Sequence, residues 1–506
     1  MKLNINNKPI DLDSLRKIAS ESIEVSIDQS VKDKVDLAFQ QIQASINNNE
    51  TVYGVNTGFG KLAKIRIENK DLEELQRNIV CSHAVGVGNF LPNKIVSLII
   101  VLKIMALSKG LSGVCNNVIQ RLCDLINHQI FPCIPAKGSV GASGDLAPLA
   151  HLSQVLIGEG YASFNGAIIS AKEALKACSL EPLKLGPKEG LALLNGTQVS
   201  TAIAIMAYFE LENLFQAGIY AGALTVDAIK GSQKPFDSRI HEARGHHGQK
   251  IVAKKLKYLL QDSEIMTSHN DCDRVQDPYS IRCQPQVMGA CLDIMHHVSS
   301  TLVIEANAVT DNPLVFVDTE EIISGGNFHA EPIAFAADHL ALAVAEIGSI
   351  SERRCALLID PQLSGLPAFL VKESGLNSGF MIPQVTAAAL VSENKNLAYP
   401  ASVDSIPTSA NQEDHVSMAT HAANRLLTMT QNLAYVIAIE YLSAAQGIDF
   451  HKPMNTSKKL QKIMQNIRAI SDSLNNDRSL APDIERLSSL IISGELCPPE
   501  HEIFSK

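Results

Sequence analysis

The chain has 506 residues, of which 46% are apolar and 19% are charged. This composition is typical of a folded globular protein with a large hydrophobic core, and it excludes an intrinsically disordered chain. The formal net charge of −10 argues against nucleic acid or an anionic membrane surface as a partner.

The N-terminal segment combines short strands with helices. The predicted strands are residues 2–6 and 23–27, and the predicted helices are residues 14–19 and 31–46. Asp13 and Asp28 stand near the beginnings of these helices and are predicted as their N-caps. The first residues lack a basic start followed by an apolar run, so we expect no secretory signal.

Three small residues in a row, Ala142, Ser143 and Gly144, lie in the run GSVGASGDLAPLAH at residues 138–151. Because Gly144 has no side chain, its amide nitrogen can approach the carbonyl carbon of Ala142 closely. Attack there closes a five-membered ring. Loss of water, including the Ser143 hydroxyl, then leaves an exocyclic methylene, which is a strong electrophile. For these three residues alone, the alternative is a glycine-rich turn before a helix that begins near Asp145.

From about residue 200 the sequence becomes dominantly helical. The long segments 286–307, 333–358 and 416–446 are apolar on nearly every face, and such helices are buried. We therefore predict a mixed α/β domain in residues 1–200 and a large helical bundle in residues 201–506. The uncharged stretch at 190–209 is long enough to span a membrane. Its polar residues favour a buried helix instead.

Ten cysteines are scattered at irregular spacing and form no Cys-x-x-Cys motif. In a large chain without an export signal, this pattern is typical of a reduced, cytosolic protein.

Candidate metal and nucleotide motifs are incomplete. His241 and His246 are one residue further apart than in the zinc-protease motif, which rotates the second histidine by about 100° around a helix. The adjacent pairs His246-His247 and His296-His297 point in different directions. The loop around Gly58 lacks the first glycine and the Ser/Thr of a phosphate loop. We predict no metal and no nucleotide.

The run at residues 138–151 resembles the signature of the aromatic amino acid ammonia-lyase family, and further family motifs follow in the family's order. They lie at residues 53–60, 82–88, 195–197, 276–282, 325–329 and 411–415. The resemblance covers nearly the whole chain. It implies a mainly α-helical, aspartase/fumarase-like architecture and a homotetramer whose active sites draw on several chains. It also implies a 4-methylideneimidazole-5-one (MIO) group that forms autocatalytically from Ala142, Ser143 and Gly144.

The family's reaction explains the need for such an electrophile. Ammonia is a poor leaving group, and the β-hydrogen of an amino acid is barely acidic. Each pK unit of mismatch between base and carbon acid costs about 1.4 kcal/mol. A turnover of about 10 per second tolerates a barrier of only roughly 16 kcal/mol. The MIO ring would draw electrons from the substrate, as pyridoxal phosphate does in other enzymes.

The resemblance implies catalytic roles for two tyrosines. Tyr53 is the candidate base for the β-proton, and its glycine-rich loop can close over the site. Tyr279 belongs to the motif that contains Arg282, the candidate anchor for the substrate carboxylate, because a guanidinium meets a carboxylate with two parallel hydrogen bonds. Gln276, in the same motif, supports substrate binding. Without the motifs, Tyr53 is a packing residue and Arg282 a surface arginine.

The resemblance also implies substrate-binding roles for Asn195 and Phe328, close to the prosthetic group. Asn195 is alternatively a helix cap. His83 and Glu413 are expected to select the substrate, because an imidazole ring offers one donor and one acceptor nitrogen. Relatives that act on phenylalanine differ at both positions. Glu413 is the stronger discriminator, since tyrosine-specific relatives also carry histidine at the first position. Glu413 is alternatively a carboxylate at a helix N-terminus.

Together the motifs imply elimination of ammonia from L-histidine to give trans-urocanate, the first step of histidine degradation, in the cytoplasm. Met381 in the run GFMIP also fits members that act on histidine. Two alternatives stay open within the family: a tyrosine or phenylalanine ammonia-lyase, and a 2,3-aminomutase. A third alternative is an inactive homologue that serves as an oligomeric scaffold.

Overall fold

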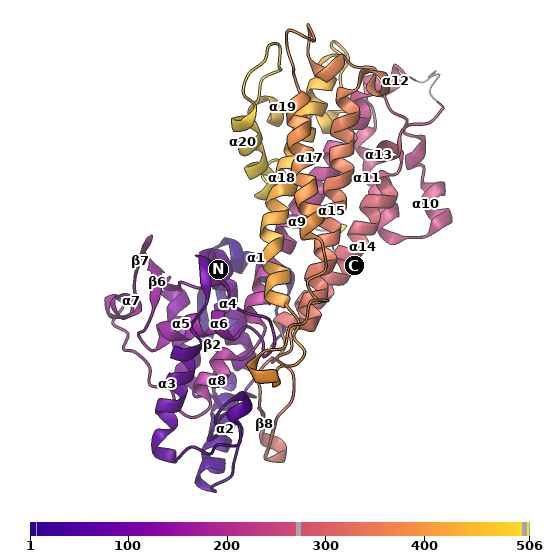
Figure 1. Cartoon of the computed structure of the whole chain (residues 1–506). Coiled ribbons are helices and arrows are strands. Elements are labelled where there is room, and N and C mark those ends of the chain that lie inside the picture. Colours follow the sequence, from indigo (N-terminus) through magenta and orange to yellow (C-terminus); the bar gives the residue numbers. More distant parts are fainter. Residues whose placement is uncertain (7, 270–274, 498–502, 505–506) are drawn as a thin grey trace. The chain divides into compact units, whose positions relative to one another are not determined.

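The computed structural model describes residues 1–6, 8–269, 275–497 and 503–504. These residues form two compact units. The first comprises residues 1–206, 299–338 and 400–424, and the second comprises residues 207–298, 339–399 and 425–506. The fold is mainly α-helical (Figure 1), which confirms the predicted fold class. The single division after residue 200 stays a prediction.

The first unit begins with two parallel strands, each followed by a helix. The elements are β1 (Lys2–Ile5), α1 (Leu12–Ser20), β2 (Glu24–Ile27) and α2 (Gln29–Asn47). Lys2 lies opposite Glu24 in the ladder. The apolar face of α2 packs in a cluster of buried side chains. That cluster contains Ala38, Ile42, Ile46, Val55, Leu72 and Val315.

One of the two predicted N-caps is correct. Asp28 caps α2 and accepts a hydrogen bond from the Ser30 amide. The prediction of Asp13 as a cap is wrong, because α1 begins at Leu12 and Asp13 lies inside its first turn. Asp11 is the cap, and its carboxylate accepts from the Ser14 amide at 2.8 Å. Asp13 instead places negative charge near the positive end of the helix dipole.

Short helices and small antiparallel sheets complete the first unit. Its further helices are α3 (Leu72–His83), α4 (Asn93–Leu107), α5 (Asn116–Asn127), α6 (Leu146–Leu156), α7 (Ala171–Ala177) and α8 (Glu189–Leu194). Its further strands are β3 (Val87–Phe90), β4 (Phe131–Pro132), β5 (Pro135–Lys137), β6 (Tyr161–Phe164), β7 (Ala167–Ser170), β8 (Leu314–Phe316) and β9 (Glu321–Ile323). The ladders join β3 with β5, β4 with β6 and β7, and β8 with β9.

Two predictions about the chemistry-bearing segments are confirmed. Helix α6 begins at Leu146, directly after Asp145. The stretch at 190–209 is buried inside the protein, but a turn at residues 195–197 divides it into α8 and the long helix α9 (Gln198–Ala228). Gly196 in this turn has φ +120°, outside the helical range, and Asn195 is the C-cap residue that ends α8.

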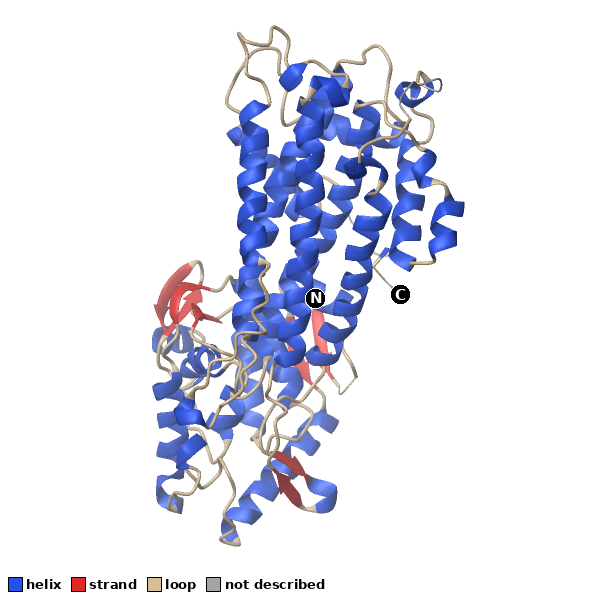
Figure 2. Ribbon diagram, turned by 45° about the vertical axis from the view of Figure 1, so that its right-hand side comes forward, coloured by secondary structure: helices blue, strands red, loops and turns tan. Residues whose placement is uncertain are grey.

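Long helices dominate the second unit, where they run side by side (Figures 1 and 2). The bounds are α10 (Ser238–Arg244), α11 (His247–Leu260), α12 (Glu264–Thr267), α13 (Tyr279–Arg282), α14 (Gln284–Ala306), α15 (Glu331–Ile359), α16 (Pro361–Ser364), α17 (Met381–Leu397), α18 (Ala419–Asp449), α19 (Lys458–Arg468) and α20 (Ala481–Ile492). The three long apolar segments predicted as helices correspond to α14, α15 and α18. The unit boundary falls within each of them and within α9.

A buried ion pair connects three of these helices. Arg354 on α15 and Glu440 on α18 are both fully buried, and their Nε and Oε1 atoms are 2.5 Å apart. Glu440 also accepts from the hydroxyls of Thr225 on α9, at 2.8 Å, and Ser351 on α15, at 2.6 Å. A buried carboxylate needs such partners.

Length and composition alone would let α14 and α15 cross a membrane. Their most apolar windows are buried inside the protein to 44% and 72%, respectively. Core helices of proteins without membrane spans have the same composition.

Candidate active site

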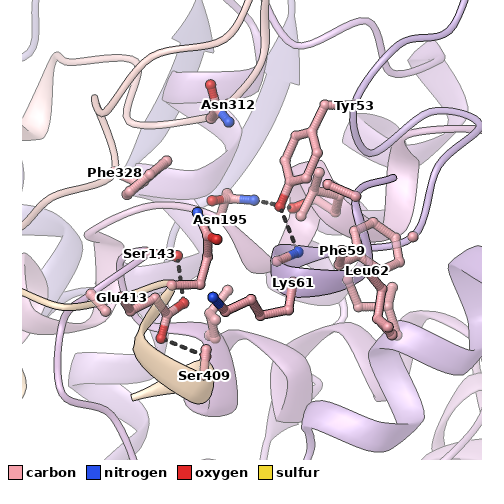
Figure 3. Close-up of a pocket in the computed structure, with 18 of the residues that line it drawn as sticks. Tyr53, Phe59, Lys61, Leu62, Ser143, Asn195, Asn312, Phe328, Ser409 and Glu413 are labelled. Carbon is pink, nitrogen blue, oxygen red and sulfur yellow. Dashed lines mark hydrogen bonds between the residues drawn. The ribbon is translucent and has the colours of Figure 1, made fainter. Parts of the chain in front are cut away.

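A cavity of about 990 Å³ lies within the first unit, and several predicted site residues line it (Figure 3). These residues are Tyr53, His83, Ala142, Ser143, Asn195, Phe328 and Glu413. They come from six motifs that are far apart in the sequence. The structure therefore brings these motifs together in one pocket.

The Ala142-Ser143-Gly144 segment is a tight turn between two glycines with positive φ. Gly141 has φ +67° and Gly144 has φ +74°. A Cβ atom on Gly144 would lie 2.1 Å from the carbonyl oxygen of Gly196, so only glycine fits at this position. A compact turn with a bare backbone at Gly144 is what ring closure requires. These residues therefore fit the MIO group.

Asp145 holds this turn from the C-terminal side and is completely buried. Its backbone amide donates to the Gly196 carbonyl at 2.7 Å. Its carboxylate accepts from the Ser200 amide at 2.7 Å and from the hydroxyls of Thr420, at 2.5 Å, and Ser139, at 3.3 Å. Burial raises the pKa of Asp145, and these hydrogen bonds oppose that effect. Sequence reasoning assigned Asp145 no role beyond the beginning of the helix.

The segment before α18 holds the turn from its other side. The Ser417 hydroxyl donates to the Gly141 carbonyl at 2.9 Å, and the Met418 amide donates to the Val140 carbonyl at 2.8 Å. A Cβ atom on Gly141 would lie 2.3 Å from the Ser417 hydroxyl oxygen. Glycine at residue 141 is therefore a packing requirement.

Glu413 faces Ser143 directly. The Ser143 hydroxyl donates to Glu413 Oε1 at 2.9 Å (Figure 3). The other carboxylate oxygen, Oε2, accepts from the hydroxyls of Thr408, at 2.6 Å, and Ser409, at 2.8 Å. Glu413 precedes α18 by six residues, so the alternative of a helix N-terminal carboxylate is wrong.

His83 is the last residue of α3 and lines the same pocket. Its Nδ1 atom lies 3.0 Å from the Ser82 hydroxyl. Burial lowers the pKa of His83, and the negative charge of Glu413 partly opposes this. A pKa below the ordinary 6.5 favours the neutral ring at pH 7, which offers one donor and one acceptor.

Tyr53 projects from the glycine-rich loop into the pocket (Figure 3). Its hydroxyl oxygen accepts from the Gly60 amide at 3.2 Å. Gly54 lies against Leu191, and a Cβ atom there would lie 2.1 Å from a Leu191 methyl. The loop thus packs on α8 at one end and bonds to the phenol oxygen at the other, which fixes the ring.

Asn195 lies at the end of α8, and its placement depends on a buried lysine that sequence reasoning missed. Lys103 on α4 is 1% exposed. Its ammonium donates to the carbonyls of Ala192, at 3.1 Å, and Asn195, at 2.5 Å. The signal was visible in the sequence, since Lys103 is the one charged residue between 95 and 107.

Lys103 predicts a pH dependence of stability. Burial lowers its pKa to about 7 from its ordinary 10.5, although Asp311 and Asp145 oppose the shift. Between these two values the unfolded chain binds more protons than the folded chain, so the free energy of unfolding rises with pH. This contribution is complete above pH 10.5 and is lost as the pH falls through about 7.

The measurement is urea unfolding of wild type and Lys103→Met at pH 6.5 and pH 9. We expect wild type to gain stability relative to the variant at the higher pH. Parallel stabilities at both values would contradict a lowered pKa at this site.

Gln276, Tyr279 and Arg282 belong to the second unit and are not among the residues that line this cavity. Tyr279 is 70% exposed, and the Arg282 guanidinium carbon lies 4.6 Å from the centre of its ring. Within the described residues, the buried Nε atom of Arg282 has no hydrogen-bond partner. A donor without a partner fits an arginine that binds an anion.

One group of side chains near the pocket offers atoms of the kinds that bind metals. Candidate ligand atoms of His329, Glu331 and His415 all lie within 4.8 Å of one another. However, the Nε2 atom of His329 is already 3.2 Å from the His415 carbonyl, and the two rings stack. The prediction of no metal stays a prediction.

The sequence model of the aromatic amino acid lyase family matches residues 10–469. The chain belongs to the aromatic amino acid lyase family. It is 57% identical to the histidine ammonia-lyase of Vibrio vulnificus strain CMCP6 over 492 residues, which cover 97% of this chain and 96% of that one. The family resemblance of the motifs is thereby confirmed.

Solved structures of family members are similar over the whole chain. A histidine ammonia-lyase from Trypanosoma cruzi has a TM-score of 0.91 at 39% identity, covering 100% of this chain and 97% of that one. A tyrosine aminomutase from Streptomyces globisporus has a TM-score of 0.93 at 33% identity, covering 100% and 99%. The same fold thus occurs in proteins with different reactions, so the fold alone does not identify the substrate.

Proposed function

We propose that this member of the family eliminates ammonia from L-histidine and releases trans-urocanate, the first step of histidine degradation. The observation that carries the proposal is that Glu413, which hydrogen-bonds to Ser143, and His83 line the same cavity as Ser143. A carboxylate supplies an acceptor and a neutral imidazole supplies a second polar partner, which suits a substrate ring with one donor and one acceptor. The 57% identity to a histidine ammonia-lyase, against 33% to a tyrosine aminomutase, supports the same choice.

The prosthetic group is part of the proposal. The MIO ring formed by Ala142, Ser143 and Gly144 supplies, when present, an electrophile that makes ammonia a viable leaving group. The chain's own residues bind the substrate and move its protons. Tyr53 takes the β-proton, and the bond from the Gly60 amide orients its phenol oxygen.

Asn195 and Phe328 hold the substrate beside the Ser143 turn. Asn195 is 4% exposed, and its side-chain amide donates to the Leu191 carbonyl at 3.3 Å. Its side-chain oxygen is left to bind the substrate or the turn. Phe328 lines the pocket with its apolar ring (Figure 3).

Arg282 binds the substrate carboxylate in this proposal, with Gln276 as a further binding residue and Tyr279 as a further catalytic one. The Nε atom of Arg282, which has no hydrogen-bond partner among the residues that the structure describes, supports the assignment. The proposed assembly is a homotetramer with composite active sites, so these residues can serve a pocket formed with another copy.

Large apolar side chains that are exposed on the long helices are surface that such an assembly would bury. The exposed examples on the long helices are Ile304 (70%), Phe335 (52%), Leu342 (47%), Ile382 (60%) and Val385 (53%). A cytoplasmic location without a metal, nucleotide, nucleic acid or membrane partner completes the proposal. The nine described cysteines form no disulfide bond with one another, which is compatible with it. Cys272 lies outside the described residues.

The experiment gives purified enzyme L-histidine, L-tyrosine and L-phenylalanine separately and follows the ultraviolet absorbance of each unsaturated product. We expect kcat/KM to be highest for L-histidine. His83→Leu should lower kcat/KM for L-histidine by about 10- to 100-fold, because one polar partner of the ring is lost. The effect of His83→Leu on kcat/KM for L-tyrosine and L-phenylalanine should be smaller.

Faster elimination from tyrosine or phenylalanine would replace the proposed substrate. Transfer of ammonia to the β-carbon, detected as a β-amino acid by chromatography, would identify an aminomutase. No reaction from folded protein would favour an inactive scaffold.

A further inference from the structure

Ser143 and Glu413 are 270 residues apart in the sequence, yet the structure joins them with a hydrogen bond of 2.9 Å (Figure 3). The bond involves Oγ of Ser143, the atom that must leave the chain if the ring forms. Among the described residues, Glu413 is the carboxylate that hydrogen-bonds to this oxygen. Glu413, which is expected to select the substrate, therefore contacts the Ser143 oxygen before ring formation removes that oxygen.

Two residues other than Ser143 hold the Glu413 carboxylate in place. Thr408 and Ser409 donate to Oε2 at 2.6 and 2.8 Å. The backbone also pairs Thr408 with Glu413, with the Thr408 amide 2.9 Å from the Glu413 carbonyl. Three hydroxyls thus donate to one carboxylate, which is the arrangement of an ionised acceptor.

Ring formation removes two waters from different atoms. The first carries the Ala142 carbonyl oxygen and leaves when the Gly144 nitrogen bonds to that carbon. The second carries Oγ of Ser143 and a proton from its Cα, two bonds away. Hydroxide is a poor leaving group, so Oγ needs a proton as its bond to Cβ breaks.

We propose that Glu413 catalyses this second dehydration by carrying the proton from Cα to Oγ of Ser143. The Cα–H electron pair becomes the Cα–Cβ double bond, and the Cβ–Oγ pair leaves on oxygen. The carboxylate takes the Cα proton and delivers it to Oγ, which departs as water. Glu413 ends ionised, so no further reactant is consumed.

After this dehydration, Oε1 of Glu413 gains a second role. Once Oγ has left, Oε1 has lost its partner while Oε2 keeps Thr408 and Ser409. Oε1 is free to accept from the ring of the substrate. This inference rests on the proposed function, because that function supplies the reason for the ring.

Other polar groups nearby are already engaged. The carboxylate of Asp145 accepts from Ser139, Ser200 and Thr420. The Tyr53 oxygen accepts from the Gly60 amide. Neither has a hydrogen bond to Ser143 in the described structure.

The experiment measures the intact mass of Glu413→Gln, freshly purified and never exposed to substrate, against wild type. Glutamine retains an oxygen that can accept from Ser143 but has no carboxylate to carry a proton. We expect it to accumulate a chain lighter than its translated mass by one water, about 18 Da. The fully dehydrated chain should appear at least tenfold more slowly. Glu413→Asp keeps the carboxylate and should lose both waters.

Asp414→Asn is the matched control, because it makes the same chemical change at the next residue, whose side chain has no hydrogen bond to Ser143 in the described structure. It should mature with wild-type masses. The inference is overturned if folded Glu413→Gln loses both waters at the wild-type rate, or if it loses none, which would place Glu413 in ring closure. A wild-type chain that loses no water would instead contradict the proposed function.

Discussion

Ser143→Ala is expected to lower kcat for ammonia release by at least about a thousandfold, equivalent to a barrier rise of about 4 kcal/mol. Alanine has no hydroxyl to lose, so the exocyclic methylene cannot form and the leaving group stays unactivated. The fold should survive, because the hydrogen bond of the Ser143 side chain is made to Glu413 alone among the described residues. Steady-state product absorbance measures the loss, and circular dichroism measures the fold.

Ser26→Ala is the control for this variant. It removes the same hydroxyl from an exposed position on β2, where Ser26 contacts Asn4. Its kcat should equal that of wild type. Wild-type kcat in Ser143→Ala would remove the prosthetic group from the mechanism.

Arg354→Met should lower the free energy of unfolding by about 3–5 kcal/mol, more than the other substitutions proposed for stability measurements. The substitution leaves the fully buried Glu440 carboxylate without its cation, although Thr225 and Ser351 still donate to it. The readout is the urea-unfolding midpoint at pH 7, at a fixed protein concentration because assembly shifts apparent stability.

The neighbouring residue provides a matched control. Arg353 also pairs with a glutamate, Glu352, at 2.6 Å, but the Arg353 side chain is 61% exposed, whereas Glu352 is 5% exposed and also accepts from Gln384 at 2.7 Å. Because the Arg353 guanidinium is in contact with water and Gln384 still donates to Glu352 when Arg353 is replaced, Arg353→Met should cost clearly less stability than Arg354→Met. The double variant Arg354→Met/Glu440→Leu should recover part of the lost stability, since no buried charge is left alone. Equal effects of the two arginine variants would contradict a buried pair.

Seven residues that the motifs predicted for a site line the same cavity, because each motif carries its own chemistry. The three small residues Ala142, Ser143 and Gly144 predicted the turn from the sequence. The structure adds that the Gly196 carbonyl leaves no space for a Cβ atom on Gly144. The sequence also predicted the long buried helices, because a helix that is apolar on every face is stable only when it is buried.

The sequence did not predict the contacts that hold the site residues in place. Nothing in the residues around Glu413 indicates that Thr408 and Ser409 fix its carboxylate, or that its free oxygen meets Ser143. Lys103 left a local signal, a lone charge in an apolar helix, but its partners lie about ninety residues away. The misplaced cap at Asp13 has a local cause, since two aspartates two residues apart compete for the same helix end.

The central claim is that this polypeptide condenses on itself at residues 142–144. Its most direct test is the intact mass of the native chain, followed by fragmentation of the peptide that contains those residues. We predict a deficit of about 36 Da, the mass of two waters, located within Ala142-Ser143-Gly144. A chain with its full translated mass and an unmodified Ser143 would contradict the account.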